Sequence, residues 1–194
     1  MTKKRVIVIV CLLLVIVGGY IAYLQLKDEK KEIEEIARQY NRFMMEIDIE
    51  VIEGQYAVAL YNWGYPYKSK FGMMEFEKTF WGWEIVTATS DRMVYTDYPA
   101  EATIFPVYNE LSEFTVLGGR VSIGRVLGGP HELRVETAEG EVYEGSEIII
   151  TDNNIWYIIS EDKVDFSGSR ITALSEDGDI IDEIYIYDEH KVNH

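Results

Sequence analysis

Side chains that could carry out catalysis are few in this sequence. It contains three histidines, His131, His190 and His194, and one cysteine, Cys11. Nucleophilic catalysis needs a nucleophile beside a base that a third group orients. The chain has no Gly-x-Ser-x-Gly motif, which would place a nucleophilic serine on a strand-to-helix turn. We therefore predict no catalytic residue, and a non-enzymatic role is favoured.

Two acidic stretches could be taken for metal sites. His190 and His194 would share one face of a C-terminal helix beside Asp188 and Glu189, and such a group can bind zinc. A solvated chain end explains these residues better. The acids around Gly178 lack the EF-hand spacing of glycine at position six and glutamate at position twelve, so a hairpin turn is favoured there. We predict no metal ion and no cofactor.

Carboxylates are the most abundant chemical groups in the chain, with 34 aspartates and glutamates. A wall-active glycoside hydrolase would use two of them, but the sequence does not show which pair lies close in space. Such a hydrolase, with two unassigned carboxylates, remains an alternative. Glu46, Asp48 and Glu50 form a row on one face of a predicted strand, which favours a solvated face over a cation site.

Aromatic residues gather between positions 63 and 83, where they could form a ligand patch. Aromatic platforms stack on sugar rings, so a cell-wall glycan is one ligand that suits them. Residues 73–87 also alternate as strands do, which favours core positions for the same side chains. The candidate patch consists of Trp63, Tyr65, Tyr67, Trp81 and Trp83.

A membrane anchor is the strongest prediction at the N-terminus. Residues 6–26 contain no charged side chain, and their length as a helix, about 31 Å, covers a bilayer core of about 30 Å. Lys3, Lys4 and Arg5 precede this segment. They favour a cytoplasmic tail at residues 1–5 and an extracytoplasmic C-terminal part in a single-pass protein of the plasma membrane.

We expect the apolar segment to be a signal anchor rather than a cleaved signal peptide, because it is too long and no Ala-x-Ala site follows it. Gly18 and Ala22 form a small-xxx-small pair on this helix. They are the candidate helix-helix contact if the protein is an accessory subunit of a membrane complex, which is a further alternative.

Beyond the first 26 residues, the chain carries 15 basic and 34 acidic residues, a net charge of −19. Such a surface repels nucleic acid, so we expect no nucleic-acid partner. The single cysteine lies in the predicted anchor, and the exterior part must therefore fold without disulfides.

The elements that would position these residues are mainly strands. Residues 27–46 have apolar positions three and four apart, which predicts a juxtamembrane helix. From Ile47 the period changes to two, and Glu53-Gly54 predicts a hairpin turn. Short strands punctuated by turns follow, with Gly118-Gly119 expected to end one of them. Residues 47–194 are thus predicted to form an antiparallel β-sandwich or barrel-like domain, with an internal boundary near 97–106.

These features resemble a loose group of short exported or membrane-anchored Firmicutes proteins of unknown function. The matching segments are the strand start Phe80-Trp81-Gly82-Trp83, the strand Ile155-Trp156-Tyr157 and the closing hairpin at residues 171–178. The resemblance implies a location and a style of fold only, because the group brings no activity or catalytic residue. We expect an envelope interaction or sensor-like module that binds a protein or wall component.

Overall fold

The structure, a computed structural model, describes residues 28–65, 68–91, 104–121 and 131–187. As predicted, it is mainly β, with one α-helix, α2 (Glu29–Tyr40), and three antiparallel sheets in the described ranges. Sheet A consists of β1 (Met44–Ile52), β2 (Tyr56–Tyr65), β3 (Lys68–Thr79) and β4 (Gly82–Asp91), in that spatial order. Sheet B has the order β5 (Ile104–Glu110), β6 (Thr115–Val121), β10 (Ile155–Ser160) and β9 (Ile149–Ile150). Sheet C has the order β12 (Ile180–Tyr185), β11 (Arg170–Leu174), β7 (Glu132–Glu136) and β8 (Val142–Glu144).

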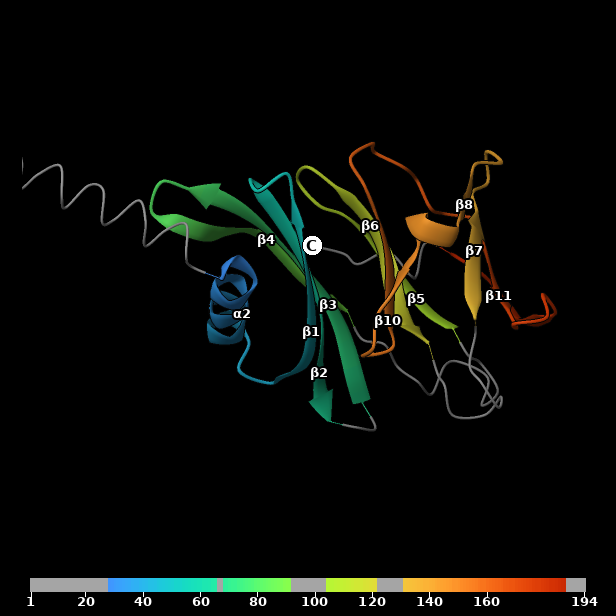
Figure 1. Ribbon diagram of the computed structural model, residues 1–194, viewed down its shortest axis with the longest axis horizontal. Coiled ribbons are helices and arrows are strands. Elements are labelled where there is room, and N and C mark those ends of the chain that lie inside the picture. Colours follow the sequence, from blue (N-terminus) through green and yellow to red (C-terminus); the bar gives the residue numbers. More distant parts are fainter. Residues whose placement is uncertain (1–27, 66–67, 92–103, 122–130, 188–194) are drawn as a thin grey trace, which may run out of the picture.

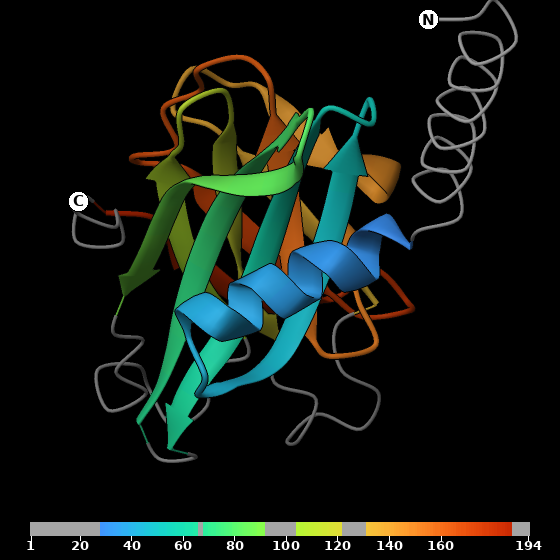
Figure 2. The same ribbon diagram turned by 90° about the vertical axis from the view of Figure 1, so that its left-hand side faces the viewer.

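The helix and the three sheets are stacked as four layers, in the order α2, sheet A, sheet B and sheet C (Figure 1). Figure 2 shows α2 lying across the outer face of sheet A. Three apolar clusters fill the spaces between the layers, and each draws on two neighbouring layers. Sheets A and B are consequently buried on both faces, whereas sheet C has an outer face without a covering layer among the described residues.

Helix α2 begins and ends where local hydrogen bonds favour it. The Asp28 carboxylate accepts the Lys31 backbone N–H at 3.3 Å, which is the usual N-cap contact. Ile33 and Ala37 are one turn apart and both face sheet A, fully buried. The helix is shorter than the predicted 27–46, because the chain becomes extended at Asn41 and Met44 already pairs with Trp63 in β2.

The first hairpin follows the predicted pattern. Glu53 and Gly54 have φ values of 49° and 68°, as a type I′ turn requires, and they join β1 to β2. The apolar positions of β1, Ile47, Ile49 and Val51, pack on the α2 side of sheet A. The alternation in the sequence therefore predicts which side chains of this strand share the apolar face.

The expectation that a strand ends at Gly118-Gly119 is wrong, because β6 continues through both residues to Val121. Neither glycine has a left-handed backbone. They are needed for close approach instead: a Cβ at Gly119 would lie 1.9 Å from the Phe105 carbonyl oxygen, and one at Gly118 would lie 2.9 Å from the Trp156 carbonyl oxygen.

The predicted anchor at residues 6–26 lies outside the described residues. Within the described ranges, no helix is both long and apolar enough to cross a bilayer. Most of the predicted boundary at 97–106 is also outside them. The segments on its two sides share one apolar cluster, in which Leu60 and Met73 of sheet A meet Val107 and Val116 of sheet B.

Candidate binding groove

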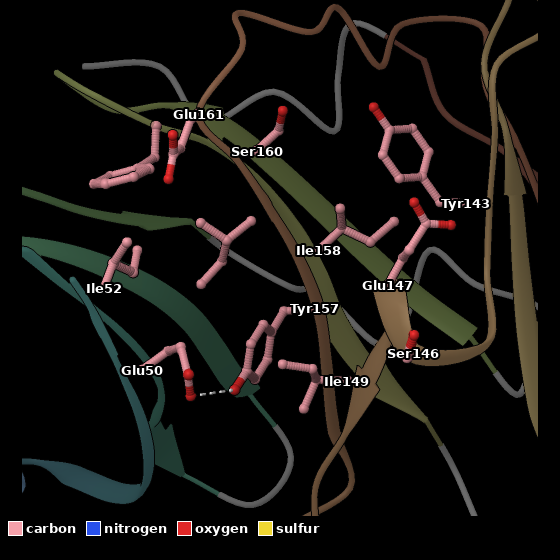
Figure 3. Close-up of a pocket in the computed structure, with 12 residues that line it drawn as sticks. Glu50, Ile52, Tyr143, Ser146, Glu147, Ile149, Tyr157, Ile158, Ser160 and Glu161 are labelled. Carbon is pink, nitrogen blue, oxygen red and sulfur yellow. Dashed lines mark hydrogen bonds between the residues drawn. The ribbon is translucent and has the colours of Figure 1, made fainter.

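One hollow lined by described residues is a groove of about 360 Å³ on one side of the stack. It lies where an edge strand of each sheet ends: β1 of sheet A, β9 of sheet B and β8 of sheet C. Figure 3 shows the side chains that surround it. The lining residues are Glu50, Ile52, Phe114, Tyr143, Ser146, Glu147, Ile149, Tyr157, Ile158, Ile159, Ser160 and Glu161.

One wall of the groove is a sheet edge that β9 covers only in part. Strand β10 pairs with β6 along its whole length, from Ile155 to Ser160. On its other side, β9 pairs only with Trp156 and Tyr157. In the described structure, the remainder of β10, residues 158–160, therefore has a strand neighbour on one side alone and borders the groove on the other.

The groove is acidic at its rim and apolar at its floor. Three carboxylates line it, those of Glu50, Glu147 and Glu161, and among the described lining residues none is lysine or arginine. Ile158 is buried below it, and Ile149 of β9 is exposed beside it (Figure 3). This combination suits a ligand with positive charge and apolar side chains.

Two tyrosines place hydroxyl groups in the groove. Burial, reinforced by the negative charge of Glu141, raises the pKa of Tyr143 to about 12. Burial, reinforced by Glu50, also raises the pKa of Tyr157, whose hydroxyl lies 3.5 Å from the Glu50 carboxylate (Figure 3). Both hydroxyls are protonated at neutral pH, as tyrosine hydroxyls ordinarily are, and that of Tyr157 donates to Glu50.

The acidic row on β1 is not the solvated face that its pattern predicts. Its three carboxylates are half-buried and contact sheet B or the turn before β10, which makes them a polar seam between the two sheets. The contacts are Glu46 to Arg120 at 3.5 Å, Asp48 to the Thr151 hydroxyl at 3.0 Å and Glu50 to Tyr157. In the part of the chain that the structure describes, no cluster of histidine, cysteine, aspartate and glutamate could hold a metal ion.

Of the aromatic residues predicted as a ligand patch, the structure places Trp63 and Trp83 at different ends of sheet A. Trp83 is buried under α2, with Lys78 Nζ 5.5 Å from its ring centroid. Trp63 is half-buried, with Lys70 Nζ 4.1 Å from its ring. Positions 70 and 78 are eight residues apart on β3, or about 27 Å at roughly 3.4 Å per residue. These two tryptophans therefore do not share one platform.

Trp81 is different, because it lies at the end of the β3–β4 hairpin with 81% of its surface exposed. The side chain of Tyr65 and the whole of Tyr67 lie outside the described residues, as do Gly18 and Ala22. His190 and His194 are also outside them, whereas His131 is exposed just before β7.

Sequence reasoning did not find the groove residues. Glu147, Glu161 and Tyr143 lie on different elements, and no spacing connects them to Glu50 more than 90 positions earlier. The one available signal was the shortness of the segment before the Asp152-Asn153-Asn154 turn, because a short edge strand leaves part of its neighbour uncovered.

The fold and groove define a class: a mainly β protein of stacked antiparallel sheets, with an acidic groove at an open sheet edge. No protein-family model matches the sequence, and neither a curated protein nor a solved structure is significantly similar to the chain.

Proposed function

We propose that the chain is a non-enzymatic binding module of the cell envelope, and that its groove accepts an extended, basic segment of a partner protein. The segment would continue β9 as an added strand along residues 158–160 of β10. The observation that carries this proposal is the coincidence of an open sheet edge and three carboxylates in one groove.

The backbone supports the strand-addition mode. An uncovered edge presents N–H and C=O groups that an extended peptide can pair with, and main-chain hydrogen bonds then supply much of the affinity. Strand β10 is already held on its other side by β6, in continuous antiparallel register. It would therefore bind a peptide without having to order itself first.

The side chains support a basic and partly apolar peptide. Residues of an added strand alternate in direction, so every second side chain would meet the carboxylates of Glu147 or Glu161 or the apolar floor near Ile158. The net charge of −19 after residue 26 would draw such a segment toward the module and raise its association rate.

The proposed location is the outer side of the plasma membrane, with residues 6–26 as the anchor and the N-terminus in the cytoplasm. The uncharged length of that segment and the basic cluster before it support this. The resemblance to the Firmicutes group of anchored proteins implies the same location. The hydrolase and the accessory-subunit alternatives stay predictions without an observation that favours either.

A peptide-binding measurement on the full-length protein in nanodiscs tests the proposal. The probe is a short capped peptide that alternates lysine and valine, compared with its glutamate–valine counterpart. We expect only the lysine peptide to bind, and the double variant Glu147→Lys/Glu161→Lys to weaken it about tenfold or more, which is roughly 1.4 kcal/mol. The matched control is Glu176→Lys/Asp177→Lys on the β11–β12 turn. It changes the net charge by the same amount, but away from the groove.

Peptide methylation separates strand addition from simple charge attraction. An added strand pairs with β10 through the amides on one of its two edges only. N-methylation of that edge should abolish binding, and N-methylation of the opposite edge should leave it nearly unchanged. Equal losses from both methylated peptides, or equal losses from the groove and control variants, would contradict the proposal.

A further inference from the structure

The β3–β4 hairpin ends in two aromatic residues at positions where turns usually have polar or small ones. Phe80 and Trp81 are 74% and 81% exposed. Their rings pack edge to face with centroids 5.0 Å apart. They form an apolar surface that no described residue covers, and they lie outside the binding groove.

Hydrogen bonds define the backbone of the hairpin end that carries the two rings. The Thr79 hydroxyl donates to the Gly82 carbonyl at 2.9 Å and accepts the Trp81 backbone N–H at 3.2 Å. Thr79 and Gly82 are also the last pair of the β3–β4 ladder. The aromatic pair is therefore a fixed projection from sheet A rather than a loose loop.

This hairpin end lies against the first turn of α2. Lys78 forms an ion pair with Glu29, the first residue of the helix. Gly82 approaches Glu32 so closely that a Cβ on the glycine would lie 2.7 Å from the Glu32 carboxylate. Figure 1 shows the hairpin projecting on the same side of sheet A as α2.

The first turn of α2 is also where the chain arrives from the predicted anchor. Only two residues separate Leu26, the end of the apolar segment, from Glu29. Even fully extended, the three steps from residue 26 to residue 29 span about 10 Å. The headgroup region on each side of a bilayer is roughly 5–8 Å deep, from a core of about 30 Å and a total of about 40–45 Å. The hairpin end is thus within reach of the bilayer surface.

Charge does not oppose contact at this place, although the protein as a whole is strongly acidic. The six charged residues 27–32 are three basic and three acidic and cancel. Around the hairpin end, Glu77, Lys78 and Glu84 leave a net charge of −1. Tryptophan favours the membrane–water interface, where its apolar ring meets lipid and its indole N–H stays hydrated, and phenylalanine is common on the lipid-facing side of interfacial segments.

We infer that Phe80 and Trp81 insert into the headgroup region of the bilayer that holds residues 6–26. The exterior domain then has two attachments to one membrane, the anchor through α2 and the hairpin end beside it. Two attachments restrict how the domain tilts, and the binding groove is held in one orientation toward the envelope.

Quenching of tryptophan emission by brominated phosphatidylcholine in vesicles that contain the full-length protein tests this inference. The chain has four tryptophans. The difference between the parent and Trp81→Phe therefore isolates the emission of Trp81. We expect this emission to be blue-shifted and to lose most of its intensity when the bromines are near the headgroups. The control moves the exposed indole to sheet C with Trp81→Phe/Ile180→Trp, because Ile180 is 65% exposed in the layer farthest from α2. The added tryptophan should not be quenched.

Three other outcomes overturn the inference. Trp81 emission that stays red-shifted and unquenched would mean that the indole remains in water. Protection from aqueous acrylamide without quenching by bromolipid, increasing with protein density, would mean that a second copy covers the hairpin end. Release of the protein by alkaline carbonate would remove the anchor on which the geometry depends. The peptide measurement on the groove does not depend on Trp81, so the two proposals can fail separately.

Discussion

Glu75 is the residue whose burial most needs an explanation. It lies on β3, it is fully buried, and it faces sheet B from sheet A. Its two carboxylate oxygens accept the backbone N–H groups of Ser112 at 2.7 Å and Glu113 at 2.8 Å. Lys163 donates to the carbonyls of Leu111 at 2.9 Å and Ser112 at 2.7 Å. The turn between β5 and β6 is thus satisfied by side chains from two distant segments.

We predict that Glu75→Ala lowers the free energy of unfolding by about 2–4 kcal/mol, since two backbone N–H groups lose a fully buried, charged acceptor. Glu75→Gln keeps one acceptor, so its free energy of unfolding should lie between those of Glu75→Ala and the parent. Urea unfolding followed by circular dichroism measures both. Glu77→Ala, at an exposed position two residues along the same strand, is the control and should change stability by less than about 0.5 kcal/mol. Equal effects at the two positions would contradict a stabilising role for the contact between Glu75 and the β5–β6 turn.

The alternation of β3 alone would place residue 75 with Phe71 and Met73, on the buried face toward sheet B. A glutamate at such a position breaks the apolar pattern of the face. The turn at 112–113, which lies opposite it, explains the glutamate by donating two N–H groups to it. The rule that buried polar groups are paired predicts that a partner exists, but not which segment supplies it.

At the scale of elements, β6 depends on Gly119. The alanine Cβ would lie 1.9 Å from the Phe105 carbonyl oxygen, so β5 and β6 must move apart at their centre. We predict that Gly119→Ala costs about 3 kcal/mol or more, at the upper end of overpacking effects. A thermal unfolding series measures this.

Gly140→Ala separates steric crowding from backbone strain in that series. Gly140 lies in the β7–β8 turn with φ of 88°, and a Cβ there would meet no atom within 4 Å. The Gly140→Ala variant should lose only about 1–2 kcal/mol of stability, which is the cost of a left-handed backbone for alanine. A loss at Gly119 no larger than that at Gly140 would show that the strands do not pack this closely.

At the scale of the whole molecule, the acidic excess opposes folding. Residues 27–194 carry a net charge of −19, and the described ion pairs are mostly solvent-exposed, so each contributes little. The dominant electrostatic term is then repulsion among carboxylates, which salt screens.

We therefore predict that raising NaCl from about 0.01 M to about 0.15 M stabilises the protein, because the Debye length falls from about 30 Å to about 8 Å. A gain of roughly 1 kcal/mol corresponds to about 2–4 °C in Tm for a protein of this size. Scanning calorimetry at constant pH, with sucrose of matched osmolarity as control, measures it. A Tm that falls with salt would mean that ion pairs outweigh the repulsion.

The sequence alone determines the local elements, because these depend on neighbouring residues. The start of α2, the Glu53-Gly54 turn and the apolar face of β1 follow from periodicity and from backbone preference at the turns. Only the tertiary structure decides the stacking into four layers, the close approach at Gly118-Gly119 and the groove at the edges of β1, β8 and β9. Those features bring together residues up to about a hundred positions apart. Such contacts depend on how well the surfaces of the folded elements fit one another. A local sequence pattern does not contain that information.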